Sequence, residues 1–283
     1  MSMLKKMIKN TLSFILYQCG RILNMRKINI LSLYFHNPTP RAFENIVMWL
    51  HKHDYSFISA EDLLLHIKGQ QILNKKSVYI SFDDGWQGNL NLMPIFIKYN
   101  IPITIFIASE PLESGNYWWE FAGANGGQCK VNEFKKYSQE TFYNELNLLK
   151  SKHSMLRSSM TVEELLELSK CPLVDIQSHT HTHPILTNLN VASLDKELAL
   201  SQERLSQIIG KQVDKFSYPN GSYSVREKDI VKKYYSCAFS TIQAYPKVGG
   251  DLYEIPRIAL TDDYWSNLAK IVGTWQLLRA FKK

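Results

Sequence analysis

The 283-residue sequence has few cysteines, no apolar run long enough to cross a membrane, and no cluster of basic residues with interleaved aromatics. Its four cysteines are far apart and match no C-x-x-C pattern, so we expect four free thiols, most of them buried. A membrane-spanning helix needs roughly 20 apolar residues in succession. Without a basic cluster, the net charge of +7 does not predict nucleic-acid binding.

The bulk composition is that of an ordinary folded protein. Hydrophobic residues make up 45% and charged residues 21%, and no repeat, low-complexity segment or long Pro/Gly linker interrupts the chain. We therefore expect a single compact domain over residues 26–283. The net charge of +7 fits an anionic polymer or membrane surface, and equally fits a soluble protein that avoids zero charge.

Residues 1–25 form a basic amphipathic pattern. Apolar residues recur at helical spacing, namely Leu4, Met7, Ile8, Leu12, Ile15, Cys19, Ile22 and Leu23. Basic residues lie largely off that stripe, at Lys5, Lys6, Lys9 and Arg21. No small-residue cleavage site of the A-x-A kind follows, which disfavours a cleaved signal peptide. Two interpretations stay open: a helix on a membrane surface, and a helix packed on the protein's own core.

From residue 28 onward, strand-like and helix-like segments alternate, which predicts an α/β fold with a parallel sheet and outer helices. The expected strands are 27–36, 77–85, 101–109, 173–181, 215–221, 237–242 and 253–260. The expected helices are 41–55, 59–67, 89–100 (interrupted near Pro94), 139–152, 162–169, 193–209 and 225–235. Residues 111–137, rich in Gly, Asn and aromatics, are expected to form a surface loop or insertion.

Polar residues stand at the ends of five of these strands: His36, Asp83–Asp84, His179–His183, Tyr218–Gly221 and the Arg257 segment. In parallel α/β folds the functional groups gather at the carboxyl ends of the strands. The recurrence therefore predicts one functional site built from several strands.

The sequence "HTHTH" supplies two imidazoles, His179 and His183, that would share one face if the segment made a helical turn, with His181 pointing elsewhere. One carboxylate of the Asp83–Asp84 pair would complete a His-His-Asp metal set, and its neighbour could take a proton from water. Alone, "DDG" is compatible with a simple turn and "HTHTH" with a solvated loop. Together, each at a strand end, they predict a catalytic metal site.

The motifs "SFDDG", "SHTHTHP" and "FSYPNG", in this order, resemble the three leading motifs of the polysaccharide deacetylases, carbohydrate esterase family 4. The resemblance covers about residues 27–260. With "LYFH" and "YSFISAEDLL" ahead of them, the motifs are most similar to the branch that deacetylates biofilm poly-N-acetylglucosamine. This resemblance implies a distorted or incomplete (β/α) barrel and metal-dependent hydrolysis of acetyl groups, usually N-acetyl groups on hexosamines.

The resemblance also implies roles for individual residues. Asp83 corresponds to the general base. Asp84, His179 and His183 correspond to the metal ligands. The backbone N–H of Tyr218 corresponds to the donor that binds the developing oxyanion, and His36 to the acid that protonates the leaving amine.

The sequence departs from the family pattern at two places. Ser217 stands where many members have an arginine that positions the base, and Arg257 is the substitute we expect, against the alternative of a structural ion pair. A late histidine motif is absent, so the acid role falls to His36 or to no histidine; a core histidine is the alternative for that residue. Trp86, Pro219 and Gly221 are expected to contact the sugar.

The predicted cofactor is a divalent metal, with zinc favoured and cobalt or nickel as alternatives. The predicted substrate is an N-acetylated polysaccharide or lipid-linked sugar in a bacterium, at the cytoplasmic face of the membrane or in the cell envelope. Two rivals stay open: an O-acetyl esterase acting on xylan or capsule, and a catalytically silent carbohydrate-binding protein of the same fold.

Overall fold

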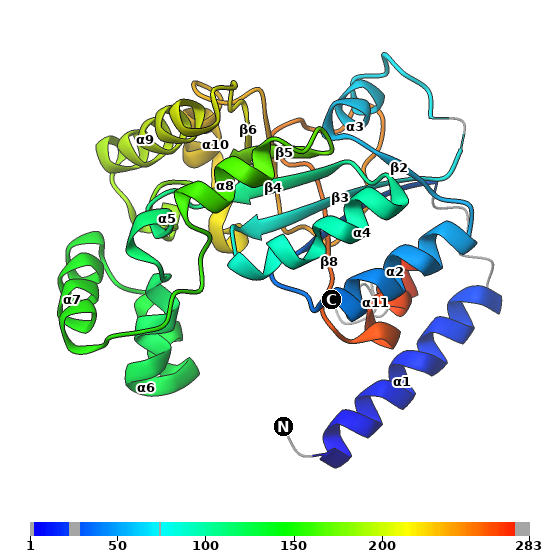
Figure 1. The fold of residues 1–283 in the computed structure, drawn as a ribbon, viewed down its shortest axis with the longest axis horizontal. Coiled ribbons are helices and arrows are strands. Elements are labelled where there is room, and N and C mark those ends of the chain that lie inside the picture. The colour runs from blue at the N-terminus through cyan, green and yellow to red at the C-terminus, as the bar shows by residue number, and fades with distance from the viewer. Residues whose placement is uncertain (1–2, 23–28, 74, 275–283) are drawn as a thin grey trace. The chain divides into compact units, whose positions relative to one another are not determined.

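The computed structural model describes residues 3–22, 29–73 and 75–274 (Figure 1). The chain divides into two compact units, each assembled from segments that are distant in the sequence. The first comprises residues 1–82, 91–104 and 241–283, and the second comprises residues 83–90 and 105–240.

Parallel strands form the centre of the first unit. β1 (Ile30–Phe35) pairs with β3 (Ser77–Asp84) on one side and with β8 (Ile258–Ala259) on the other, and β2 (Ser56–Ile58) pairs with β3. Every residue of β1 and β3 is buried, as expected of parallel strands that are covered on both faces. The helices of this unit are α1 (Met3–Ile22), α2 (Pro40–Lys52), α3 (Ala60–Ile67), α4 (Met93–Tyr99) and α11 (Tyr264–Ile271).

In the second unit, β5 (Val174–Ser178), β6 (Lys215–Ser217) and β7 (Cys237–Phe239) pair in parallel. β3 and β4 (Ile103–Ile107) run from the first unit into the second, and the strand order is β7-β6-β5-β4-β3-β1-β8. The helices are α5 (Pro111–Ser114), α6 (Trp118–Phe134), α7 (Gln139–Lys152), α8 (Val162–Ser169), α9 (Val191–Ile209) and α10 (Val225–Val231). The expected parallel α/β architecture is confirmed.

Most helix starts follow from local sequence. The Ser59 hydroxyl accepts from the Asp62 N–H at 3.1 Å while the Asp62 carboxylate accepts from the Ser59 N–H at 3.0 Å, a capping box. The helical segment expected over 89–100 is divided near Pro94, as predicted: a 3-10 helix covers Gln87–Leu92 and α4 begins at Met93. Pro94 lies in the first turn of α4, where a missing N–H costs no helical hydrogen bond.

The alternative of a surface loop over residues 111–137 is wrong, since most of that segment is helical. α6 continues through a kink at Gly126 and Gly127 and packs beside α7 (Figure 1). The two helices share an apolar core that includes Trp118, Phe121 and Phe142. Aromatic residues three positions apart on α6 therefore serve a helix–helix interface, which their composition alone did not indicate.

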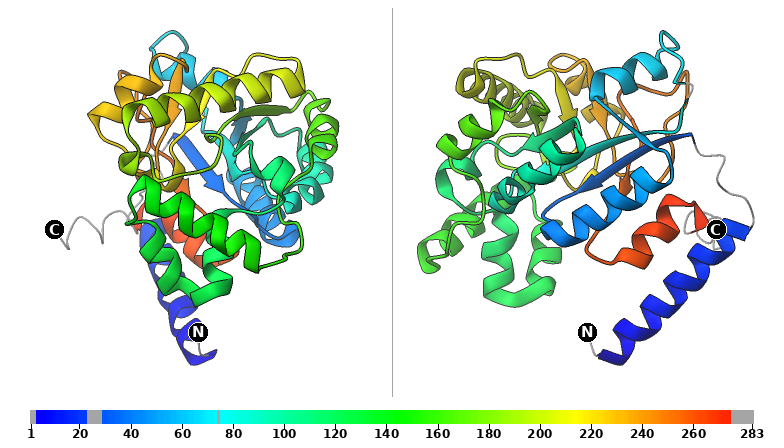
Figure 2. Two further views of the ribbon diagram at one scale, coloured as in Figure 1. Left: turned by 90° about the vertical axis from the view of Figure 1, so that its left-hand side faces the viewer. Right: turned by 45° about the vertical axis from the view of Figure 1, so that its right-hand side comes forward.

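α1 lies alongside α11 (Figure 2). The face of α1 that packs carries Tyr17, whose ring lies 5.8 Å from that of Trp265, and Gly20, where an added Cβ would be only 2.6 Å from Val272. The predicted apolar stripe is the opposite, exposed face, with described members Met7, Ile8, Leu12, Ile15, Cys19 and Ile22. Leu23 and the side chain of Leu4 lie outside the described residues. Within the described ranges, no helix is both long and apolar enough to cross a membrane.

Candidate active site

The site begins where β3 ends on two buried carboxylates, Asp83 and Asp84. Asp84 has φ 78° and Gly85 has φ 94°, so the chain leaves the strand through the left-handed region. A Cβ at Gly85 would lie 2.9 Å from the Cδ1 atom of Ile107, which adds a steric reason for glycine. The turn begins at Asp84, so the Asp84 carboxylate does not follow the alternating pleat that Asp83 keeps.

The three predicted metal ligands converge. Asp84 Oδ1 lies 3.5 Å from His179 Nε2 and 3.4 Å from His183 Nε2, and one ligand atom from each residue lies within 4.8 Å of the others. All three side chains are buried. An N₂O set with this spacing is compatible with a single divalent cation.

The path that brings the histidines together is not the expected helical turn. Thr180 has φ 70° and His183 has φ 55°, so two left-handed residues fold the loop after β5 back on itself. His181 points elsewhere, as expected, with its Nδ1 atom 2.8 Å from the Ser109 hydroxyl. The alternating histidines thus reach one point by backbone turns and not by helical periodicity.

The protonation of the two imidazoles fits a metal. His179 Nδ1 lies 2.7 Å from the Ser217 carbonyl oxygen, so it donates there and leaves Nε2 with its lone pair toward Asp84. Burial lowers the pKa of His183, which favours the neutral form that ligates metals. The Nδ1 atom of His183 is buried with no hydrogen-bond partner within the described part of the chain. The donor set therefore fits a divalent metal and leaves its identity open.

Glu197, on α9, anchors the histidine loop, the segment of residues 179–183 after β5. Its carboxylate accepts from the backbone N–H groups of His181 at 3.0 Å and Thr182 at 2.8 Å, and from the Thr182 hydroxyl at 2.7 Å. Tyr143 donates to it at 3.3 Å, and burial raises the pKa of Tyr143 to about 12, so this hydroxyl stays protonated. No feature of the sequence pointed to Glu197, because a glutamate in mid-helix is usually a solvated residue.

The second oxygen of Asp84 is also engaged. The indole N–H of Trp86 donates to Asp84 Oδ2 at 2.8 Å, leaving Oδ1 toward the histidines. Trp86 was expected to contact sugar, and that role stays a prediction. In the structure, its indole orients the Asp84 carboxylate, a predicted metal ligand.

Three consecutive aromatic residues, missed as site residues from the sequence, lie against the predicted metal ligands. The Tyr117 hydroxyl donates to the Asp84 carbonyl at 3.2 Å, and the Tyr117 ring stacks on Trp119. Trp119 meets the His183 ring edge-on at 4.5 Å, and the indole N–H of Trp118 donates to the His183 carbonyl at 2.8 Å. The sequence feature that could have pointed to these residues is the run "YWW", which lies in a segment that was expected to be a loop.

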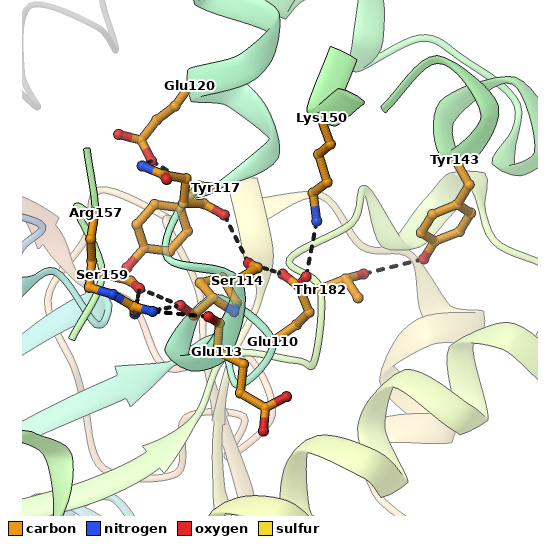
Figure 3. A network of polar contacts seen from close by, with 12 residues as sticks. Glu110, Glu113, Ser114, Tyr117, Glu120, Tyr143, Lys150, Arg157, Ser159 and Thr182 are labelled. Carbon is orange, nitrogen blue, oxygen red and sulfur yellow. Dashed lines mark hydrogen bonds and ion pairs between the residues drawn. The ribbon is translucent and has the colours of Figure 1, made fainter. Parts of the chain in front are cut away.

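A polar network fixes the chain that carries these aromatics (Figure 3). Lys150 of α7 donates to Glu110 at 3.0 Å, and the Arg157 guanidinium donates to the Glu113 carbonyl at 2.9 Å. Arg157 thereby satisfies a carbonyl at the end of α5, one of those that a short helix leaves without an internal partner. Glu120, in the same network, accepts from the Tyr117 backbone N–H at 2.9 Å and so fixes the backbone at Tyr117.

Asp83, the predicted base, contacts the residue that replaces the family arginine. The Ser217 hydroxyl donates to Asp83 Oδ2 at 3.3 Å, and both side chains are buried.

The oxyanion role of the Tyr218 backbone N–H does not fit this structure. That N–H donates to the Phe239 carbonyl at 3.1 Å, next to the β6–β7 pairing. Pro219 and Gly221 form a 3-10 turn after β6, and their sugar contacts stay predictions.

Two predicted site residues belong to the first unit. Arg257 is fully buried, donates to the Ser81 hydroxyl at 3.0 Å and lies over the Tyr34 ring at 4.3 Å; its role stays a prediction. His36 follows β1 and is exposed, so the alternative of a buried core histidine is wrong.

Comparisons with known proteins agree with this site. Residues 70–236 match the polysaccharide deacetylase family. The chain is 26% identical over 267 residues to a poly-beta-1,6-N-acetyl-D-glucosamine N-deacetylase of Staphylococcus aureus, covering 87% of this chain and 79% of that protein. The Staphylococcus epidermidis protein of the same name is 26% identical over 251 residues, covering 83% and 72%.

Solved structures share the fold. IcaB from Ammonifex degensii superposes with a TM-score of 0.64 at 18% identity, over 86% of this chain and 97% of that one. The Streptococcus pyogenes deacetylase PplD, solved with acetate, gives 0.62 at 17% identity, over 86% and 97%. The fold is thus the (β/α) barrel type of these deacetylases, as predicted. The chain belongs to the polysaccharide deacetylase family, and it is a hydrolase of the type that includes the poly-N-acetylglucosamine deacetylases.

Proposed function

We propose that this protein is a metal-dependent N-deacetylase that removes acetyl groups from the N-acetylated amino sugars of a surface polysaccharide or glycolipid. The observation that carries the proposal is the convergence of Asp84, His179 and His183 beside Asp83 in a chain of this family. The names of the staphylococcal relatives support poly-N-acetylglucosamine as the substrate class.

Asp84, His179 and His183 would hold the metal, with zinc favoured by the donor set. A bound divalent cation supplies Lewis-acid polarisation of the acetamide carbonyl and lowers the pKa of water. Asp83 takes a proton from the attacking water, and the Ser217 hydroxyl holds the Asp83 carboxylate in position. Hydrolysis breaks the amide C–N bond and yields acetate and a free amine.

His36 is proposed as the acid that protonates the departing amine, supported by its exposed position after β1. Arg257 is proposed to position the base. Its contact residue Ser81 is two residues before Asp83 in β3, a spacing that places both side chains on one face of a strand. A buried guanidinium on that face would favour the ionised carboxylate.

We further propose that the enzyme works while peripherally bound to a membrane through residues 1–25. The support is that the predicted apolar stripe of α1 is exposed and is not the face packed on α11. A membrane-bound enzyme would meet a lipid-linked or nascent polysaccharide.

The test of the catalytic proposal is Asp83→Asn, with Asp229→Asn on the surface of α10 as the matched control. Loss of a general base costs roughly 10²–10⁴ in rate, so Asp83→Asn should lower acetate release from N-acetylglucosamine oligomers by that factor. It should still bind zinc at one ion per chain, because Asp83 is not a ligand. An Asp83→Asn enzyme as active as the control would refute the assignment.

A further inference from the structure

The two histidines of the predicted metal site differ in what holds their rings. His179 Nδ1 lies 2.7 Å from the Ser217 carbonyl oxygen, the kind of contact that usually orients a metal-ligating histidine. The Nδ1 atom of His183 is also buried, but it has no hydrogen-bond partner among the residues that the structure describes. When Nε2 ligates a metal, Nδ1 carries the ring proton, so His183 would bury an N–H without an acceptor. Buried donors of this kind are costly and therefore rare.

The indole of Trp119 lies against the His183 ring. The two ring centroids are 4.5 Å apart and the ring planes meet at 66°, which is an edge-to-face arrangement. Tyr117 stacks on Trp119 with the centroids 4.6 Å apart and the planes only 10° apart, so Tyr117 covers one face of the indole. The other face of the indole is left for the imidazole.

The orientation of His183 limits which edge of its ring can meet that face. Nε2 is turned toward Asp84 Oδ1, 3.4 Å away, as a ligand atom of the metal site should be. Among the other ring atoms, only Nδ1 carries a polar hydrogen in this tautomer. The face of an indole is electron-rich, and it can accept such a hydrogen in an N–H···π contact.

The alternative acceptor is the carbonyl oxygen of His183 itself. It favours a proton on the imidazole, but it does not meet Nδ1 with hydrogen-bond geometry. The same oxygen already accepts from the Trp118 indole N–H at 2.8 Å. The face of Trp119 is therefore the better partner for the Nδ1 proton.

We propose that Trp119 positions His183 by accepting its Nδ1–H on the face of the indole, the task that the Ser217 carbonyl performs for His179. Trp119 is thus a positioning residue that acts through a metal ligand. The inference rests on the proposed metal site and deepens it, because it assigns the missing partner of the second histidine.

The test is the NMR signal of the two Nδ1 protons in the full-length, zinc-loaded protein with ¹⁵N-labelled histidine. The ring current of an indole shields a proton over its face, whereas donation to a carbonyl deshields a proton. We therefore expect the His183 signal well upfield of the His179 signal, with a nuclear Overhauser effect to the Trp119 ring protons. In Trp119→Leu the His183 signal should lose its upfield shift, and the His179 signal should stay in place.

Zinc affinity, measured with a competing chelator, gives a second readout. An N–H···π contact is weak, so Trp119→Leu should bind zinc about two- to fivefold less tightly than the wild type. Trp119→Phe keeps an aromatic face and should restore most of the affinity and of the upfield shift. Leucine and phenylalanine both fill space with apolar atoms, so a role in packing alone does not predict this rescue.

The matched control is Trp265→Leu, which removes an indole of α11. The ring contacts of Trp265 are with Phe14, Tyr17 and Tyr264, and none is with a predicted metal ligand. This variant should change neither the His183 signal nor the zinc affinity.

Two results would overturn the inference. A His183 signal that is not shifted upfield, and that is the same in Trp119→Leu, would assign the proton to the His183 carbonyl or to a bound water. Equal zinc affinities of Trp119→Leu and Trp119→Phe would leave Trp119 only a packing role. A wild type that binds no zinc would remove the proposed function and this inference together. A wild type that binds zinc and releases acetate, but whose His183 signal is not shifted, would remove the inference alone.

Discussion

Glu197 is the residue whose removal tests the architecture of the site most sharply. In Glu197→Ala, the N–H groups of His181 and Thr182 and the Thr182 hydroxyl each lose their acceptor. An unsatisfied buried donor costs about 1–3 kcal/mol, and water entering the vacated space would recover part of it, so we expect a loss of about 3–5 kcal/mol in the free energy of unfolding. Loss of a group that orients metal ligands typically lowers metal affinity 10–100-fold, so zinc should bind more weakly by that factor.

Urea unfolding gives the stability and a competing chelator gives the zinc affinity. Glu203→Ala, an exposed glutamate on the same helix, is the matched control, and it should change neither quantity. Glu197→Gln keeps one oxygen acceptor and should fall between alanine and the wild type. A Glu197→Ala protein with wild-type stability and zinc affinity would show that the histidine loop does not depend on this carboxylate.

Two further predictions follow from single contacts. Trp86→Phe removes the indole donor to Asp84 Oδ2 while keeping an aromatic ring. The zinc affinity, measured by calorimetry, should therefore fall about tenfold. An unchanged zinc affinity would leave Trp86 only its predicted contact with the sugar. Burial raises the pKa of the Cys237 thiol from 9.0 to about 12, so between these values the unfolded chain loses a proton that the native chain keeps, and stability falls as pH rises. The slope from Cys237 is at most about 1.4 kcal/mol per pH unit, and urea unfolding of Cys237→Ala should lack it; equal slopes would contradict the assignment.

The cysteines also correct an expectation from composition. Most were expected to be buried, yet Cys19 and Cys129 are exposed, Cys171 is intermediate and only Cys237 is buried. Burial preference is a statistical tendency of the residue type, and the positions on α1 and α6 that face solvent are set by how those helices pack.

The parts of the site that the sequence predicts are those carried by contiguous motifs. Asp84, His179 and His183 stand at strand ends, and parallel strands bring such ends to one edge, so their meeting could be anticipated. The backbone path that brings the two histidines together could not be predicted. Its left-handed residues, Thr180 and His183, are not glycines, so the residue types gave no sign of the turns.

Residues that act on the motifs from elsewhere were not predictable. Tyr117, which caps the start of α6, and Glu197, in α9, reach the site only through tertiary packing, and neither stands at a strand end. Ser217 was noted for the arginine it replaces, and only the structure showed its hydroxyl on Asp83. The oxyanion role of the Tyr218 N–H could not be tested from the sequence either. That N–H donates to the Phe239 carbonyl, and this hydrogen bond depends on how β6 and β7 pair.

The most direct test of the central claim is acetate release from N-acetylglucosamine oligomers and from O-acetylated xylan, with metal-stripped and zinc-restored protein. We predict acetate from the oligomers only when zinc is present. Acetate release from xylan alone would favour the O-acetyl esterase interpretation. Acetate release from the oligomers by protein from which all metal has been removed would contradict the metal assignment. A protein that holds no stoichiometric zinc and releases no acetate from either substrate would contradict the account as a whole.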